Sequence, residues 1–163
     1  MSWMVRETKS AFRHGAGTAL GHTVVGCLLA ALVLGACSGG GAVSGAQEEQ
    51  AKKANAICQD AQDAIGRQLG ADPTKDEAAL HTAADKLKAL DPPSENQNTW
   101  MLFVQSTNNL WLSALDYQQA LDPAVNDRAR AQRALQRVHD NNAQVMKYAE
   151  EYHALECAKG FGR

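Results

Sequence analysis

Apolar side chains recur every three or four residues over most of the chain from residue 47 to the C-terminus. Proline and glycine interrupt this pattern at only a few points. The long segments between them are rich in Ala, Leu, Gln, Lys and Glu, which favour helices. We find neither the alternating pattern of a half-buried strand nor an internal repeat. The sequence therefore predicts an all-α fold, a four-helix antiparallel bundle in up-down-up-down order with short connections.

The first two helices have signals at their ends. The first is expected from about Gln47 to Leu69, because Gly70 follows the last apolar residue and a left-handed glycine commonly ends a helix. Residues 74–77, Thr-Lys-Asp-Glu, form a capping box that predicts the start of the second helix. The Asp-Pro-Pro sequence at 91–93 predicts its end, since a residue before proline is pushed out of the helical region.

The third and fourth helices follow the same rules. Residues 94–97, Ser-Glu-Asn-Gln, form a second capping box that predicts the start of the third helix. Asp122, with a proline after it, is the expected N-cap of the fourth helix, and Asn126 and Asp127 are the alternatives. The seam of the fourth helix alternates steps of four and three residues, as in a bundle with shallow crossing angles. This seam is Ala131, Leu135, Val138, Asn142, Val145, Ala149 and Tyr152.

The expected helices differ in length. At a rise of about 1.5 Å per residue, the third and fourth would reach about 40–50 Å, whereas the second, and the first beyond Cys58, would reach about 16–24 Å. Either the last two helices project as a hairpin, or one of them bends. A projecting hairpin would expose apolar side chains, and an exposed apolar patch marks a partner site. These side chains are Trp111, Leu115, Leu121 and Leu135.

Residues 1–36 have the pattern of an export signal. Three basic residues and one acidic residue occupy the first fifteen positions, and the stretch 23–36 is apolar and uncharged. A positive segment before an apolar run of this length is typical of a secretory signal. The run is short for a membrane helix, which needs about 20 apolar residues. Extending it back to Ala16 across His22 leaves an uncleaved signal anchor as an alternative.

The apolar run ends in Leu-Gly-Ala-Cys at 34–37, which resembles the lipobox of bacterial lipoproteins. An ordinary secretory cleavage site prefers small residues, and Leu34 fits that preference poorly. The resemblance implies cleavage before Cys37 and attachment of diacylglycerol, with acyl chains such as palmitate, to its thiol. The expected parts are a signal peptide at 1–36, the lipidated Cys with a Gly/Ser-rich flexible tether at 37–46, and a helical domain at 47–163.

The cysteines predict a disulfide. Cys27 lies in the segment to be removed and Cys37 is the expected lipid site, which leaves Cys58 and Cys157. Two cysteines in an oxidising compartment most often form a disulfide. The alternative is a metal site, because His153 would lie one helical turn before Cys157, and thiolates with an imidazole suit zinc or copper. The stretch after Cys157 offers no further ligand, so we expect the disulfide and no metal or other cofactor.

Four short motifs together resemble those of small actinobacterial lipoproteins. They are the lipobox at Cys37, Ala-Ile-Cys at 56–58, Leu-Asp-Pro-Pro at 90–93 and Leu-Glu-Cys at 155–157. The resemblance covers the whole chain after Cys37, and it implies a helical bundle with a Cys58–Cys157 bridge. It carries over no catalytic residue.

Charge and motifs limit the functional classes. The chain has 16 Lys and Arg and 18 Asp and Glu, and the signal takes three and one of these, so 13 and 17 remain after cleavage. The resulting net charge of −4 argues against a nucleic-acid binder. The sequence has no nucleophile elbow, no Gly-rich phosphate loop and no acid pair for hydrolysis. We therefore expect no enzyme.

The sequence predicts a lipoprotein anchored to the outer face of a bacterial cytoplasmic membrane. Its expected role is that of a non-catalytic accessory or scaffold subunit that contacts another envelope protein. A helical lipoprotein that binds a small molecule or a metal is the alternative. Export and the acidic charge leave no role for nucleic acid as a partner.

Three groups of side chains allow more than one interpretation. Trp100 and Trp111 could line a small-molecule cleft between helices, although core packing is the default. Four arginines at 128–137 could face anionic lipid headgroups, but a solvated helix face is the commoner reason for such a run. Met101 and Met146 are expected to fill the core.

Overall fold

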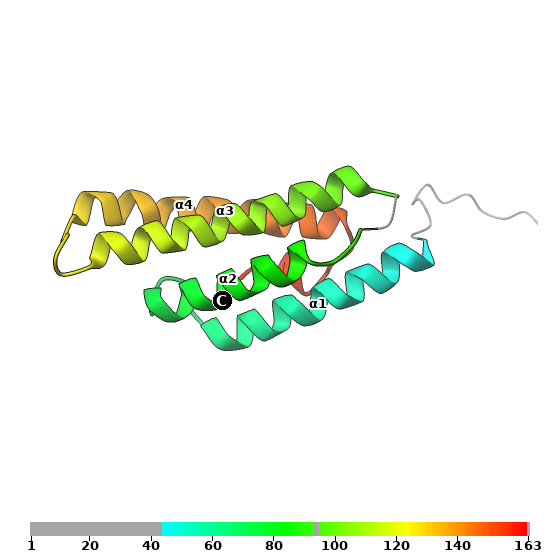
Figure 1. The fold of residues 1–163 in the computed structure, drawn as a ribbon, viewed down its shortest axis with the longest axis horizontal. Helices are drawn as coiled ribbons and strands as arrows, with labels where there is room; N and C mark the ends of the chain where they lie inside the picture. Colours follow the sequence, from blue (N-terminus) through cyan, green and yellow to red (C-terminus); the bar gives the residue numbers. More distant parts are fainter. Residues whose placement is uncertain (1–43, 93–94, 163) are drawn as a thin grey trace, which may run out of the picture. The chain divides into compact units, whose positions relative to one another are not determined.

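A computed structural model describes residues 44–92 and 95–162. Within these residues the fold is all-helical, with four α-helices, one short 3-10 helix and no β-strand (Figure 1). The helices are α1 (Gly45–Ile65), α2 (Pro73–Lys88), α3 (Gln97–Leu121), α4 (Arg128–Glu151) and the 3-10 helix η1 (Cys157–Lys159). The predicted all-α class is confirmed. The predicted signal peptide and the lipid site Cys37 lie outside the described residues.

α1 begins and ends earlier than the sequence predicted. Its N-cap is Ser44, whose hydroxyl accepts a hydrogen bond from the N–H of Gln47 at 3.2 Å. The last two residues of the predicted tether, 45–46, are therefore helical. The helix ends before Gly66, which adopts a φ of 83°, a value that glycine reaches without steric cost. Leu69, predicted as the last helical residue, is buried in the connection to α2 instead.

α2 begins at Asp72 and Pro73 and not at the predicted capping box. The Asp72 carboxylate accepts a hydrogen bond from the N–H of Lys75 at 3.1 Å. Pro73 occupies the first helical turn, where its missing N–H has no partner to lose. The predicted cap, Thr74, lies inside the helix, and its hydroxyl accepts a hydrogen bond from Gln118 of α3 at 3.3 Å. Asp72 also places a negative charge at the positive end of the helix dipole, which favours it as the cap.

The N-cap positions of α3 and α4 also differ from the first choice of the sequence. Asn96 occupies the N-cap position of α3 with a φ of 57°, and the predicted cap Ser94 lies outside the described residues. Asp127 caps α4 by accepting a hydrogen bond from the N–H three residues later at 2.9 Å, so one of the two alternatives is confirmed. Asp122 ends α3, because the residue before a proline is pushed out of the helical region.

The helices contact one another in sequence order. α1 lies against α2, α2 against α3, and α3 along α4, while η1 contacts both α4 and α1 (Figure 1). The buried side chains lie mostly on one face of each helix, as the amphipathic pattern predicts. Trp100 lies at the centre of an aromatic cluster, with its ring 5.6 Å from that of Phe103 and 4.9 Å from that of Tyr152.

The predicted seam of α4 faces the core. Its buried members are Ala131, Val138, Val145, Ala149 and Tyr152. Leu135 and Asn142 are partly buried. Asn142 uses its amide to hold the C-terminal segment, since Oδ1 accepts a hydrogen bond from the N–H of Phe161 at 3.0 Å and Nδ2 donates to the carbonyl oxygen of the same residue at 3.2 Å.

Trp111 is half-buried against α2, which differs from the expectation for a projecting hairpin. Its indole N–H donates a hydrogen bond to the carboxylate of Glu77 at 2.7 Å, and its ring stacks on His81 at 4.2 Å. Of the side chains predicted to be exposed, Leu121 is 45% exposed and the others are partly buried. Val125, in the connection from α3 to α4, is also exposed. The large apolar side chains exposed from Trp111 to the connection are thus Leu112, Leu121 and Val125.

Asp76, in the first turn of α2, is a buried carboxylate. Its side chain is 2% exposed, Oδ2 accepts a hydrogen bond from the N–H of Gly70, and Oδ1 has no partner among the described residues. Burial raises the pKa of Asp76 above its ordinary value, because desolvation disfavours the charged form more than the Gly70 hydrogen bond favours it.

This raised pKa predicts a dependence of stability on pH. The folded chain holds the Asp76 proton more tightly than the unfolded chain, so the stabilisation from protonation is lost as the pH rises through the folded pKa. We expect the unfolding free energy of the wild type, relative to Asp76→Asn, to decrease between about pH 3 and pH 7 in urea titrations. Asp60→Asn, at a mostly exposed carboxylate, is the matched control. A difference that stays constant or increases with pH would contradict the prediction.

Candidate functional site

The disulfide predicted between Cys58 and Cys157 is present. It joins α1 to η1 over a sequence separation of 99, its Cα atoms are 5.1 Å apart, and both side chains are fully buried. A side chain of α1 holds the backbone beside the bridge, because Oδ1 of Asn55 accepts a hydrogen bond from the N–H of Glu156 at 2.8 Å. The bridge thereby fixes the C-terminal segment against α1.

The disulfide excludes the metal site considered from the sequence, because it uses both thiols. The helical spacing assumed for that site is also wrong. α4 ends at Glu151, and His153 is exposed with a φ of 66°, so it does not share a helical face with Cys157. Within residues 44–92 and 95–162, no three His, Cys, Asp or Glu side chains are grouped so that they could hold a metal ion.

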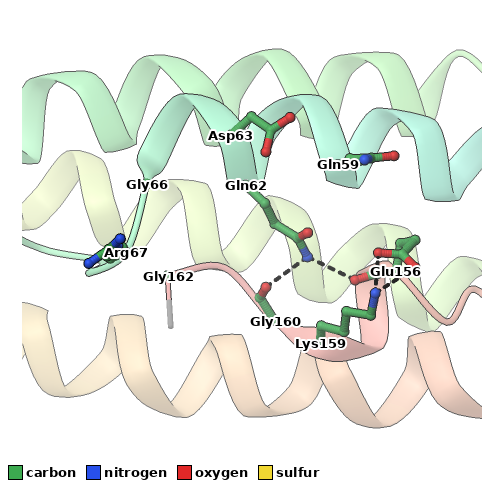
Figure 2. A pocket seen from close by; sticks show the side chains of 9 residues that line it. All are labelled: Gln59, Gln62, Asp63, Gly66, Arg67, Glu156, Lys159, Gly160 and Gly162. Atoms are coloured by element: carbon green, nitrogen blue, oxygen red, sulfur yellow. Dashed lines mark hydrogen bonds and ion pairs between the residues drawn. The ribbon is translucent and has the colours of Figure 1, made fainter.

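A polar cavity of about 460 Å³ lies between the end of α1 and the C-terminal segment (Figure 2). It is lined by Gln59, Gln62, Asp63, Gly66, Arg67, Glu156, Lys159, Gly160 and Gly162. The amide of Gln62 donates hydrogen bonds to the carbonyl oxygens of Glu156 at 2.8 Å and Gly160 at 2.9 Å. Lys159 forms an ion pair with the carboxylate of Glu156. The contacts of Gln62 therefore connect α1 to the C-terminal segment.

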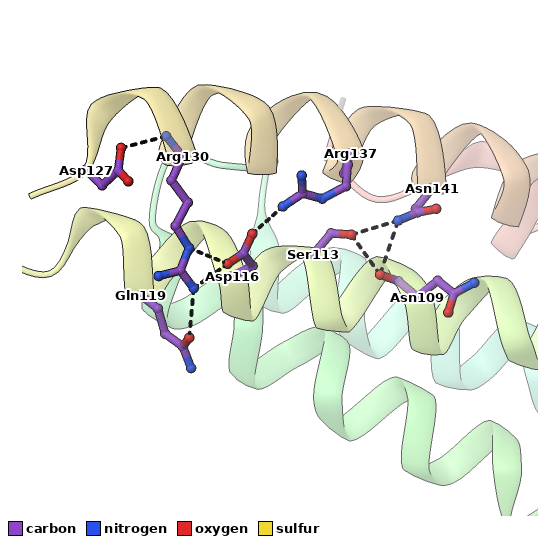
Figure 3. Close-up of polar contacts among 8 residues, drawn as sticks. All are labelled: Asn109, Ser113, Asp116, Gln119, Asp127, Arg130, Arg137 and Asn141. Atoms are coloured by element: carbon purple, nitrogen blue, oxygen red, sulfur yellow. Dashed lines mark hydrogen bonds and ion pairs between the residues drawn. The ribbon is translucent and has the colours of Figure 1, made fainter. Parts of the chain in front are cut away.

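A row of polar side chains connects α3 to α4 on the outside of the domain (Figure 3). Asp116 of α3 accepts hydrogen bonds from Arg130, at 2.8 Å, and from Arg137 of α4. Further along, Asn141 donates to the hydroxyl of Ser113 at 2.7 Å. Two of the four arginines predicted as a basic stretch are therefore bound to a carboxylate within the domain, and their charge is partly neutralised.

A mainly apolar groove of about 520 Å³ lies between the end of α2 and the start of α3, the α2–α3 groove. Its apolar lining is Ala84, Leu90, Pro92, Trp100, Met101 and Val104, and its polar lining is Lys88, Asp91, Gln105 and Asn108. Trp100 lines the groove, whereas Trp111 does not. The default expectation of core packing is confirmed for Trp100, which is 3% exposed and also borders this groove, while Trp111 is partly buried. The groove is the strongest candidate binding site among the described residues.

The two methionines are not core residues, which corrects the sequence prediction. Met101 is 59% exposed and Met146 is 38% exposed. Successive helical residues point about 100° apart, so Met101 turns outward once Trp100 points inward. The sequence contained a signal for this, because four apolar residues in succession at 100–103 cannot all face one side of a helix.

No family model matches this chain, and neither does any curated protein or solved structure. In the part of the chain that the structure describes, no helix combines the length and the apolar character that are needed to cross a membrane. Function is therefore inferred from the residues of this chain alone.

Proposed function

We propose that this protein is a bacterial lipoprotein that is cleaved before Cys37, lipidated there and held on the outer face of the cytoplasmic membrane. The basic segment, the apolar run and Leu-Gly-Ala-Cys at 34–37 support this proposal. The disulfide between Cys58 and Cys157 is the structural observation that carries it. Disulfides persist in oxidising compartments and are rare in the cytosol, so the bridge supports a domain that resides outside the cytoplasm.

We also propose that the four helices form an up-down-up-down antiparallel bundle. Contacts between α3 and α4 support this order, because Arg130, early in α4, binds Asp116, late in α3, whereas Asn141, later in α4, binds the earlier residue Ser113. The disulfide supports it as well, since it brings the segment after α4 to α1. Short connections between sequential helices favour antiparallel neighbours.

Within the envelope, we propose a non-catalytic accessory or scaffold role in contact with another envelope protein. In the cavity beside η1, Gln62 binds the backbone of Glu156 and Gly160, and in the α3–α4 row Asp116 binds two arginines. These contacts connect helices and segments of the domain, which supports a structural role for these groups. Exposed apolar side chains at both ends of α3 favour binding over catalysis. The second candidate function is binding of a small apolar molecule in the α2–α3 groove, which Trp100 and Met101 favour.

Lipidation is tested by Cys37→Ala, which is expected to remove the acyl adduct completely because the thioether needs this thiol. Expressed as the full chain in a bacterial host, the wild type should begin at Cys37 and carry the adduct in an intact mass spectrum. Cys27→Ala is the matched control, because it removes a cysteine from the same apolar run outside residues 34–37. It should be processed like the wild type. A wild-type chain that begins at Met1, or that lacks an adduct, would overturn the proposal.

The role is tested by affinity capture of the lipidated protein from gently solubilised membranes after mild crosslinking. One envelope protein recovered in stoichiometric amount would support the accessory role. A protein recovered alone would count against it. Native mass spectrometry of the same preparation would then show whether a small apolar molecule is bound, as the second candidate function requires.

A further inference from the structure

The tether enters the domain beside the start of α3. Gln47, in the first turn of α1, accepts a hydrogen bond at 2.7 Å from the amide of Asn96, the N-cap of α3. Its own amide donates to the carbonyl oxygen of Tyr152, the C-cap of α4, at 3.4 Å. The start of α1, the start of α3 and the end of α4 thus meet at one end of the domain, the tether end (Figure 1).

Two large apolar side chains are exposed at the tether end. Met101 and Leu102, in the second turn of α3, are 59% and 42% exposed. Met101 also lines the α2–α3 groove together with residues 90–92. The tether end therefore presents apolar side chains from α3 and from the connection between α2 and α3.

The tether is short. Cys37 lies seven residues before Ser44, the N-cap of α1. Seven residues span at most about 25 Å when fully extended, and about 15 Å as a flexible chain. A lipid on Cys37 would therefore confine the tether end close to the bilayer. Because the anchor already holds the domain at the membrane, its apolar side chains would meet the bilayer at a high effective concentration.

We infer that the tether end docks on the lipid bilayer, with Met101 and Leu102 in contact with its interface. This inference rests on the proposed lipidation at Cys37. Apolar side chains that enter the boundary between headgroups and acyl chains strengthen membrane binding in proportion to the apolar area they bury. Docking adds this contact to the lipid anchor and fixes the orientation of the domain.

Charge does not drive docking at the tether end. Glu48 pairs with Lys52 at 2.7 Å, and Glu49 pairs with Lys53 at 2.8 Å. The first turns of α1 therefore carry balanced charge. Exposed carboxylates lie close by, in the connection between α2 and α3 and at the end of α4, at Asp91, Glu95, Glu150 and Glu151. An anionic bilayer repels these carboxylates, so the lipid anchor and the apolar contact must outweigh that repulsion.

Docking determines which surface faces away from the membrane. The connection between α3 and α4 lies at the opposite end of α3, with Leu121 and Val125 exposed. Arg128 and Arg133 are exposed at the start of α4. On a docked domain these side chains point away from the bilayer, so the basic stretch does not contact lipid headgroups.

Methionine oxidation tests the docking. After cleavage before Cys37, the chain contains Met101 and Met146 as its only methionines. By exposure alone, mild peroxide should oxidise Met101 faster than Met146. For the lipidated protein on vesicles of mixed phosphatidylcholine and phosphatidylglycerol, we expect the reverse order, with oxidation of Met101 slowed several-fold. If Met101 remains the faster of the two, the docking is overturned.

Two matched variants locate the contact. Leu102→Glu places a charge in the docked surface and is expected to restore rapid oxidation of Met101. Leu112 is 46% exposed and lies on the same face of α3 as Met101, about 16 Å further along the helix. Leu112→Glu is therefore expected to leave Met101 protected. Loss of protection in both variants would mean that the whole face of α3 lies on the bilayer, and the end-on arrangement would be wrong.

The same samples separate the two proposals. An intact mass without an acyl adduct on Cys37 would overturn the anchoring and, with it, the docking. An acylated, vesicle-bound protein in which Met101 is oxidised first would overturn only the docking.

Discussion

Replacing Cys58 and Cys157 together with alanine is expected to destabilise the domain by up to about 4.7 kcal/mol, the chain-entropy value for a loop of about 100 residues. The bridge spans 99 positions and connects α1 to the segment after α4, so its loss increases the conformational freedom of most of the unfolded chain. Net stabilities of about 5–15 kcal/mol are typical of single domains. We therefore expect a drop in Tm on the order of 15–20 °C, measured by calorimetry.

Reduction provides the control for this prediction. Both sulfur atoms are fully buried, so a thiol reductant should leave the native protein oxidised and act only when urea opens the domain. Wild type reduced in urea and refolded with the reductant still present, so that its thiols stay free, should approach the Tm of the double variant. A Tm within about 3 °C of the oxidised wild type would contradict the entropic role of the bridge.

Periodicity predicted the helices themselves. Because the core forms from one face of each helix, a 3–4 spacing of apolar residues contains most of the required information, and the seam of α4 is an example. The disulfide was also predicted, since the expected export left only two cysteines to pair. The order of the helices in space does not follow from this pattern, because it depends on contacts between residues far apart in the chain.

Helix ends were predicted less well, because several residues in each connection can cap. Asp72 and Thr74 are both good N-caps, and the sequence analysis chose Thr74 because a glutamate follows three residues later. The structure uses the Asp72 carboxylate instead and leaves Thr74 to contact α3. The same competition applies to Asp122 and Asp127 before α4. Where local signals have similar strength, tertiary contacts determine which residue caps the helix.

The candidate site was predicted in part. The apolar stripe of α3 indicated Trp100, which lines the α2–α3 groove. Exposure of Met101 followed from the run of four apolar residues, but Met is also a common core residue, and that preference led to the wrong assignment. The cavity beside η1 depends on Gln62 and on backbone carbonyls of the C-terminal segment, and no local pattern indicates such contacts.

Phe161→Ala is expected to destabilise the domain by about 3–5 kcal/mol, the usual cost of removing a buried phenylalanine. The last residues of a domain are ordinarily poorly ordered unless they are tied down. Here Phe161 is fully buried, and the amide of Asn142 binds both its N–H and its carbonyl oxygen. The residue therefore belongs to the core although it lies near the end of the chain. Urea unfolding with an unchanged slope should show the loss.

Two comparisons make this prediction specific. Leu155→Ala removes an exposed side chain from the same segment and should change the stability by no more than about 0.5 kcal/mol.

Gly66 and Gly162 both have positive φ, but a Cβ on Gly162 would collide with the backbone of Leu69, whereas one on Gly66 would meet nothing within 4 Å. Gly162→Ala should therefore be the more destabilising of the two, because only it forces the C-terminal segment away from Leu69. Equal losses for both glycine variants, or a loss below about 1 kcal/mol for Phe161→Ala, would show that the segment is not packed as described.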